Sequence, residues 1–181
     1  AIVTGVRREN LALSVRLCTS LGEKLTELDR LDRKCETGTI VIYGATRRTV
    51  EEVASWLGQT HPSVGYYHAG LSDDERRLVH DDFRQGQLRI LVATNAFGMG
   101  IDKSDVRLVV HIDIPGSIEA YYQEAGRAGR DGLPAACVLL FHERDLSTQE
   151  YFIQQAAKDP ASGERAARMR TLLREMLVYV S

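Results

Sequence analysis

Five short apolar runs that alternate with helical patterns constrain the fold of this chain more than any other feature. The runs cover residues 39–43, 64–67, 88–93, 106–111 and 135–141; the first is continuous and β-branched, whereas Arg89 interrupts the third. Continuous apolar runs of this length are typical of strands that are buried on both faces of a parallel sheet. Strands that alternate with helices favour a doubly wound domain. We therefore predict an α/β fold with a parallel sheet and helices on both faces.

The segments between these runs carry helix signals. Thr49 with Glu52 and Ser72 with Glu75 have the spacing of capping boxes. Gly86 is expected to end the helix that follows Ser72, and Ser117 to cap the helix that contains Tyr121. Residues 19–33, 143–158 and 164–179 also have helical patterns, with a break at 159–163.

The charge balance limits how this chain can bind nucleic acid. The 181 residues carry a formal net charge of −2, so a basic surface over the whole domain is excluded. Any such contact must come from a local patch. Cys18, Cys35 and Cys137 are far apart and form no C-x-x-C motif, so we expect reduced thiols of a cytosolic protein rather than a zinc site or a disulfide. We find no secretion signal.

Polar, glycine-bearing segments follow three of the predicted strands, where ligands bind in sheets of this type. Thr46 could help to form an anion site at a helix start, or it could simply cap the helix. His68 could contact a phosphate or a sugar, although a lone histidine is more often structural. In residues 93–103, Asp102 could accept hydrogen bonds from ribose hydroxyls, and Gly100 would permit close approach of the backbone to a ligand. The alternative is that the segment is only a long glycine-rich connection.

Two arginines in a glycine frame form the most informative motif. If a helix persists there, Gln123, Arg127 and Arg130 share one face and present an amide and two guanidinium groups to a polyanion. The alternative is a solvated helix end. The sequence has no G-x-x-x-x-G-K-[ST] phosphate loop and no Asp-Glu pair after an apolar strand. The chain can therefore receive phosphate, but it lacks the parts that bind and hydrolyse a nucleotide alone.

Three separated segments, residues 43–48, 93–103 and 121–132, resemble motifs IV, V and VI of superfamily 2 helicases. The sequences from Ala96 to Lys103 and from Gly126 to Gly132 are similar to the corresponding segments of RecQ DNA helicases. The resemblance covers residues 2–158. It implies the second of two RecA-like lobes for residues 1–158. Residues 159–181 would then be a helical lead-in to a zinc-binding subdomain, and the chain would be a piece of a longer protein.

The resemblance also implies roles for individual residues. Arg130 would be the arginine finger on the ATP γ-phosphate, with Arg127 and Gln123 beside it as further catalytic residues. Gly100 and Asp102 would lie in the ATP cleft. Contacts to the DNA backbone would come from the small polar and basic residues Thr46, Arg47, His68, Gly70, Thr94 and Asn95.

The same family implies the cofactors and partners. ATP and Mg²⁺ would be held mainly by the first lobe, and zinc would be bound in the full-length protein but not by this chain. The partners would be single-stranded and forked DNA and the first lobe, with 3′–5′ unwinding in repair and recombination. We expect a cytoplasmic protein, or a nuclear one in a eukaryote. The alternatives are a non-catalytic nucleic-acid or partner-binding module and the lobe of an RNA helicase.

Overall fold

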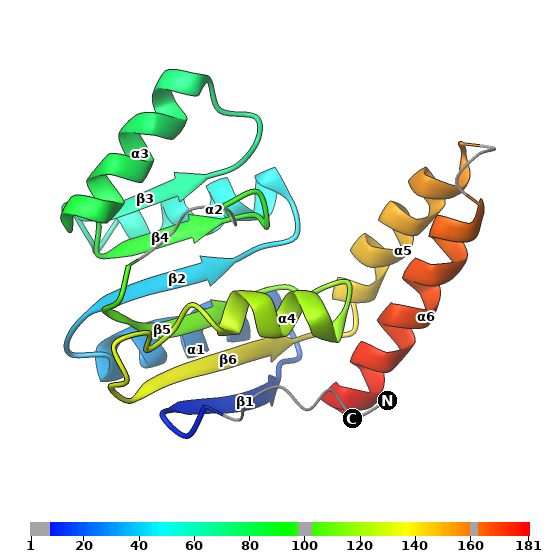
Figure 1. Ribbon diagram of the computed structural model, residues 1–181, viewed down its shortest axis with the longest axis horizontal. Helices are drawn as coiled ribbons and strands as arrows, with labels where there is room; N and C mark the ends of the chain where they lie inside the picture. The colour runs from blue at the N-terminus through cyan, green and yellow to red at the C-terminus, as the bar shows by residue number, and fades with distance from the viewer. Residues whose placement is uncertain (1–7, 98–102, 160–162) are drawn as a thin grey trace.

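A computed structural model describes residues 8–97, 103–159 and 163–181, and its central feature is one parallel sheet (Figure 1). Within the described residues the sheet has six strands in the order β1-β6-β5-β2-β4-β3, and every neighbouring pair is parallel. The strands are β1 (Leu11–Leu17), β2 (Thr39–Tyr43), β3 (Val64–Tyr67), β4 (Ile90–Ala93), β5 (Val106–His111) and β6 (Ala135–Phe141).

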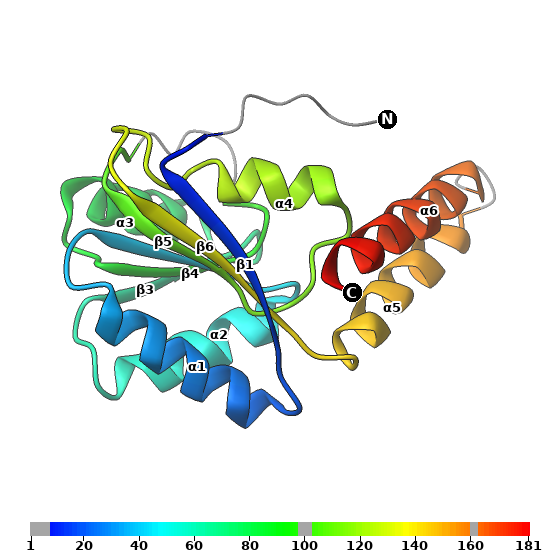
Figure 2. The same ribbon diagram turned by 90° about the horizontal axis from the view of Figure 1, so that it is seen from below.

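Helices cover both faces of this sheet, which confirms the predicted fold class. Figure 2 shows α1 and α2 on one face and α3 and α4 on the other. The helices are α1 (Leu21–Lys34), α2 (Arg47–Gly58), α3 (Asp73–Gln85), α4 (Ile118–Ala125), α5 (Asp145–Ala157) and α6 (Gly163–Val180). Among the described residues, none of these helices combines the length and the apolar character that crossing a bilayer requires.

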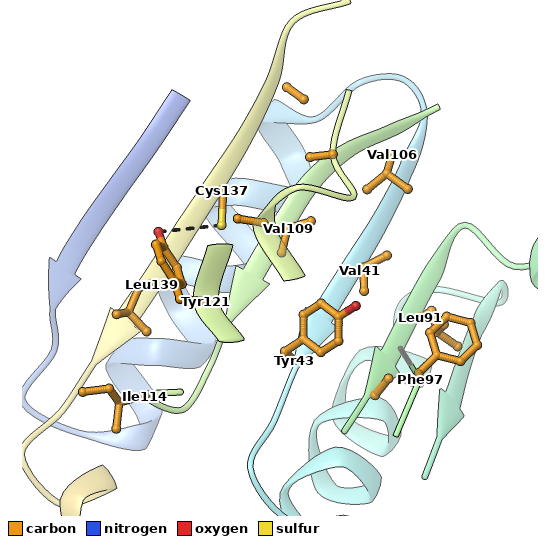
Figure 3. Packing of buried hydrophobic residues seen from close by; sticks show 14 of the residues in the cluster. Val41, Tyr43, Leu91, Phe97, Val106, Val109, Ile114, Tyr121, Cys137 and Leu139 are labelled. Carbon is orange, nitrogen blue, oxygen red and sulfur yellow. Dashed lines mark hydrogen bonds between the residues drawn. The ribbon is translucent and has the colours of Figure 1, made fainter. Parts of the chain in front are cut away.

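Strand β2 explains why the apolar runs are continuous. All of its residues are buried, and alternate side chains enter two different cores. Ile40 and Ile42 pack in the core beneath α1 and α2. Val41 and Tyr43 pack in the opposite core with Tyr121 of α4 (Figure 3), and Phe83 of α3 belongs to the same core. A polar residue on either face would lose its contact with water, so the alternating pattern of a half-exposed strand is absent.

The capping signals are confirmed with one exception. Ser72 and Glu75 form a complete capping box, Gly86 ends α3 in the left-handed conformation, and Ser117 caps α4. The predicted Thr49–Glu52 box is wrong, because Thr46 is the cap of α2 and accepts a hydrogen bond from the Thr49 N–H. Glu52 instead pairs with Arg48 along the helix surface.

Strand β1 was not predicted from the sequence. It pairs with β6 at the edge of the sheet, from Leu11 opposite Ala135 to Leu17 opposite Phe141. Its apolar residues alternate with Ser14 and Arg16, since only one side of it packs on the core that contains Tyr121. Residues 8–17 therefore lack the continuous apolar run that marks the other strands.

Helices α5 and α6 pack against each other as a hairpin at the end of the sheet toward which the strands point (Figure 1). Ile153, Ala166 and Leu173 form the small core between the two helices. At its C-terminal end α6 also joins the main core, where Met176 is fully buried and Tyr179 packs on Tyr121. The apolar face of α6 thus has partners in this chain, and the division at residue 158 stays a prediction.

Candidate functional site

An open groove of about 1090 Å³ lies at the carboxyl ends of the strands. We call it the polar groove after the hydroxyl, amide and guanidinium groups in it, although most of its lining surface is apolar. One side is formed by the segments that follow β2, β4 and β5, which include Thr46, Arg47, Thr94, Asn95 and Asp113. The other side is formed by residues of α5 and α6. Ligands bind at this edge in open α/β sheets, so the groove is the first candidate site.

Thr46 and Arg47 lie where α2 begins. The Thr46 hydroxyl accepts the Thr49 N–H at 3.0 Å, so the capping role is present. Asp113 accepts the Ala45 N–H at 2.8 Å and fixes the turn before the helix. Arg47 is exposed at the rim of the groove, beside the positive end of the helix dipole. The capping role does not exclude an anion site here, because a helix start leaves several N–H groups without helical partners.

His68 is held inside the protein. Its Nδ1 accepts the Gly70 N–H at 3.2 Å, and its Nε2 lies 2.8 Å from Glu51 Oε1. An accepting Nδ1 requires the proton on Nε2, which donates to Glu51. Gly70 is in turn close to Arg47, because a Cβ at Gly70 would lie 2.7 Å from Arg47 Nη1. This geometry favours a positioning role for His68, and its contact with DNA stays a prediction.

Thr94 and Asn95 form a tight turn after β4. The Phe97 N–H donates to the Thr94 carbonyl at 3.0 Å, and Thr94 itself donates to the Tyr67 carbonyl at 3.1 Å. Thr94 is buried, whereas Asn95 is exposed in the polar groove. Gly100 and Asp102 lie outside the described residues, so the ATP-cleft role of both stays a prediction.

The arginine segment, which we define as residues 126–132, follows α4. The helix ends at Ala125, and Gly129 has a left-handed backbone with φ of 57°. The condition for a shared helical face of Gln123, Arg127 and Arg130 is therefore not met, and the alternative of a helix end is the one observed. Gln123 is exposed on α4 and donates to Glu119 at 3.2 Å.

Contacts from distant parts of the chain brace this segment. Arg8 donates to the Gly126 carbonyl at 2.8 Å, and Asn10 donates to the Gly129 carbonyl at 2.8 Å. The Gly129 N–H donates to the Val106 carbonyl at 2.8 Å, and Arg107 pairs with Asp131. Val106 begins β5, so the segment lies near the amino end of that strand. Arg130 is exposed on this fixed loop, and Arg127 is half-buried.

A buried polar cluster that the sequence analysis missed lies under α4. His111 Nε2 is 2.8 Å from Glu124 Oε2, and the His111 ring stacks on Tyr43 with 5.4 Å between centroids. Figure 3 shows the contact between Cys137 and the Tyr121 hydroxyl. Burial raises the pKa of Cys137 to about 12, so its thiol stays protonated. No spacing pattern links these residues, because they come from separate strands and a helix.

Tyr43 connects this cluster to both candidate regions. It lines the polar groove at the end of β2. Burial raises the pKa of its hydroxyl above the ordinary range, and the Arg127 guanidinium beside it acts in the opposite direction. Arg127 therefore reaches from the arginine segment to the carboxyl end of β2. This contact gives the two regions a direct physical connection.

Residues 23–132 match the family described as "Helicase conserved C-terminal domain". The chain is 39% identical over 172 residues to the ATP-dependent DNA helicase RecQ of Bacillus subtilis, which covers 95% of this chain and 29% of that protein. It is 36% identical over 180 residues to the ATP-dependent helicase wrn-1 of Caenorhabditis elegans, with coverage of 98% and 17%. The chain thus spans less than a third of the length of either relative.

Solved structures show the same fold. The C-terminal domain of the DEAD-box protein Dbp5 is 28% identical, with a TM-score of 0.64 over 80% of this chain and 86% of that one. An S. cerevisiae Dbp5 variant bound to RNA and ADP BeF3 has a TM-score of 0.65 at 29% identity, over 78% of this chain and 39% of that one. The chain therefore belongs to the helicase conserved C-terminal domain family, and its likeness to the second RecA-like lobe of RecQ-type DNA helicases is confirmed.

Proposed function

We propose that this chain is the second motor lobe of an ATP-dependent 3′–5′ DNA helicase that acts on forked DNA in repair and recombination. Arg130 supplies the arginine finger, and the polar groove supplies contacts to the DNA backbone. The observation that carries the proposal is the bracing of the arginine segment, which holds an exposed arginine on a fixed loop. An arginine finger must be positioned before the reaction, because it stabilises the charge of the transition state best when the protein does not have to rearrange during the reaction.

The isolated chain is not expected to hydrolyse ATP. Arg130, with Arg127 and Gln123 as further catalytic residues of this proposal, supplies one side of a phosphate site, but the sequence has no phosphate loop to form the other side. An arginine supplied across a cleft contributes about 10³–10⁵ in rate in related nucleotide hydrolases. Hydrolysis would then depend on closure of two lobes, which couples the ATP state to movement.

The metal ions are assigned elsewhere in the full-length protein. Following the resemblance to RecQ DNA helicases, Mg²⁺ is bound with ATP mainly by the first lobe, and zinc is bound by residues outside this chain.

The polar groove suits contacts that ignore base sequence. Hydroxyl, amide and guanidinium groups from Thr46, Asn95 and Arg47 line it, beside the start of α2. Groups of this kind bind phosphate oxygens and carry no sequence information directly. A protein that moves along DNA needs such contacts, because every step presents a different base.

The experiment joins this lobe to the first lobe of its parent protein and measures DNA-stimulated ATP hydrolysis. We expect Arg130→Ala to reduce turnover by about 10³-fold or more while the affinity for ATP changes little. Arg84→Ala, an exposed arginine on α3, is the matched control and should leave turnover unchanged. Full turnover in Arg130→Ala would refute the arginine finger.

A second candidate is the lobe of an RNA helicase, because a solved relative of this fold is bound to RNA. Unwinding of matched DNA and RNA duplexes by the two-lobe protein separates the candidates. We expect strand separation of the DNA duplex, and preferential separation of the RNA duplex would favour the second candidate.

A further inference from the structure

The second wall of the polar groove is formed by α5 and α6, outside the segments that resemble helicase motifs. Tyr151, Phe152 and Gln155 of α5 line it, together with Arg165 and Met169 of α6. These residues face the wall that contains Arg47 and Asn95. The groove is therefore open between an arginine-bearing helix start on one side and a helical hairpin on the other.

Buried polar contacts fix this hairpin to the sheet. Lys24 Nζ of α1 lies 2.7 Å from Asp145 Oδ1 at the start of α5, and both side chains are almost fully buried. Lys24 also donates to the Ile112 carbonyl. One turn further along α5, Gln149 Nε2 donates to the Ile114 carbonyl at 2.7 Å. Since Ile112 and Ile114 follow β5, the wall is held directly against the carboxyl end of the sheet.

Tyr151 gives this fixed wall an aromatic surface. Its side chain is 55% exposed although it lines the groove, and its ring centroid lies 6.1 Å from that of Phe152. Burying an exposed phenol ring against a flat partner is favourable, and every nucleobase offers such a face. A rigid helix that presents an exposed ring in a polar groove is suited to stacking one base.

The charges in the groove favour an anionic ligand. Arg47 and Arg165 are exposed on opposite walls. The groove is lined by three arginines, Arg47, Arg48 and Arg165, against two carboxylates, Asp113 and Glu124, each of which is hydrogen-bonded within the protein. The groove is therefore more cationic than the net charge of −2 suggests. A polyanion with flat bases matches both its charge and its aromatic ring.

We propose that Tyr151 and Arg165 form a nucleotide subsite for single-stranded DNA, in which Tyr151 stacks on a base and Arg165 binds a neighbouring phosphate. This inference rests on the proposed function in one respect, namely that the polar groove receives DNA. It adds residues from a helical hairpin to a site otherwise built from strand ends.

The test measures binding of fluorescein-labelled oligothymidylate to the whole 181-residue chain by fluorescence anisotropy at low salt. Tyr151→Ala and Tyr151→Leu should each weaken binding by ~5-fold to ~150-fold, because both remove an aromatic face. Tyr151→Phe should bind like the wild type. The leucine variant separates stacking from wall packing, since it keeps an apolar side chain.

Arg165→Ala should reduce the slope of log affinity against log salt concentration by about 0.7, the value for one phosphate contact on a single strand. Arg168→Ala, an exposed arginine on the same helix that does not line the groove, is the matched control. Tyr122→Ala serves the same purpose for Tyr151, since Tyr122 is 50% exposed on α4.

The outcomes distinguish this inference from the proposed function. Wild-type affinity in Tyr151→Ala and Tyr151→Leu, with weakened binding in Arg47→Ala, overturns the subsite and leaves DNA binding by the groove intact. Absence of binding by the wild-type chain also overturns the subsite. The arginine finger is unaffected by either result, because its test measures ATP turnover in the two-lobe protein.

Discussion

Gly129 holds the arginine segment in a conformation that another residue would strain. Its φ is 57°, and a Cβ there would lie 2.6 Å from Asn10 Nδ2 and 2.7 Å from the Leu133 carbonyl oxygen. Left-handed backbone is costly for residues with a Cβ, and the Leu133 carbonyl cannot move without moving the chain. The glycine is thus explained by contacts within the protein, before any close approach of a ligand is considered.

We therefore expect Gly129→Ala to lower the free energy of unfolding by about 1–3 kcal/mol. Urea denaturation of this chain measures it. Gly58→Ala is the matched control, because a Cβ at Gly58 meets nothing within 4 Å and its backbone is helical. The control should be neutral or stabilising, since alanine is the better helix former. Equal stability of the two variants would contradict our account of Gly129.

Asp131 makes the stability of the same segment depend on pH. The hydrogen bond from Arg107 is the main cause that lowers the pKa of Asp131 from its ordinary value of 3.8. Just below pH 3.8, the native state therefore binds fewer protons than the unfolded state. The contribution of Asp131 to the free energy of unfolding is present above that pH and is lost as the pH falls. We expect Asp131→Asn to flatten the loss of stability between about pH 5 and pH 2. Parallel urea-denaturation profiles for variant and wild type would contradict this.

At the scale of elements, the sequence predicted those parts whose signals are local. The five apolar runs contain strands, and the Ser72–Glu75 box begins a helix as expected. Strand β1 was missed because an edge strand that packs on one side carries polar residues such as Arg16. A local sequence pattern reveals a strand that is buried on both faces more readily than a short strand that is buried on one face.

The candidate site was predictable to a similar extent. Thr46 was identified from its position after a strand, and Arg47, Thr94 and Asn95 from the resemblance to helicase motifs; the structure brings all four together in one groove. The second wall could not be predicted, because the approach of Tyr151 depends on long-range contacts such as that between Lys24 and Asp145. The shared face of Gln123, Arg127 and Arg130 required helical geometry to persist through residue 130, but α4 ends at Ala125 and Gly129 turns the chain.

The Lys24–Asp145 pair yields a prediction about how α5 is attached. Burial raises the pKa of Asp145, and Lys24 beside it acts in the opposite direction. Lys24→Met leaves a buried carboxylate without its counter-ion and should cost about 3–5 kcal/mol of stability at neutral pH. That loss should shrink as the pH falls, because a protonated Asp145 needs no counter-ion.

The double variant Lys24→Met with Asp145→Leu should recover most of the loss, since it removes both charges. Arg33→Ala provides the control on the same helix, because the Arg33–Asp29 pair is exposed and such pairs contribute about 1 kcal/mol or less. Urea denaturation measures all three. A Lys24→Met variant as stable as the wild type would show that the pair does not hold α5 in place.

At the scale of the whole molecule, the lobe keeps two polar regions apart and joins them through its core. The polar groove lies at the carboxyl end of the sheet, and the arginine segment is fixed to Val106 at the amino end of β5. Tyr43, His111 and Glu124 line the groove and contact one another, and Arg127 of the arginine segment lies beside Tyr43. With this layout, a substitution in the groove can change ligand binding without changing the charge-stabilising arginine, and a substitution of that arginine can leave ligand binding unchanged.

This separation predicts opposite kinetic defects in the two-lobe protein. Arg47→Ala should raise the DNA concentration for half-maximal stimulation of ATP hydrolysis by about tenfold, the cost of one charged hydrogen bond, and leave the maximal rate near that of the wild type. Arg130→Ala should lower the maximal rate and leave the half-maximal DNA concentration unchanged. ATPase titrations with single-stranded DNA measure both constants. If each variant changed both constants equally, the groove and the arginine segment would act as one site. The position of Arg127 beside Tyr43 would then explain how the two regions are coupled.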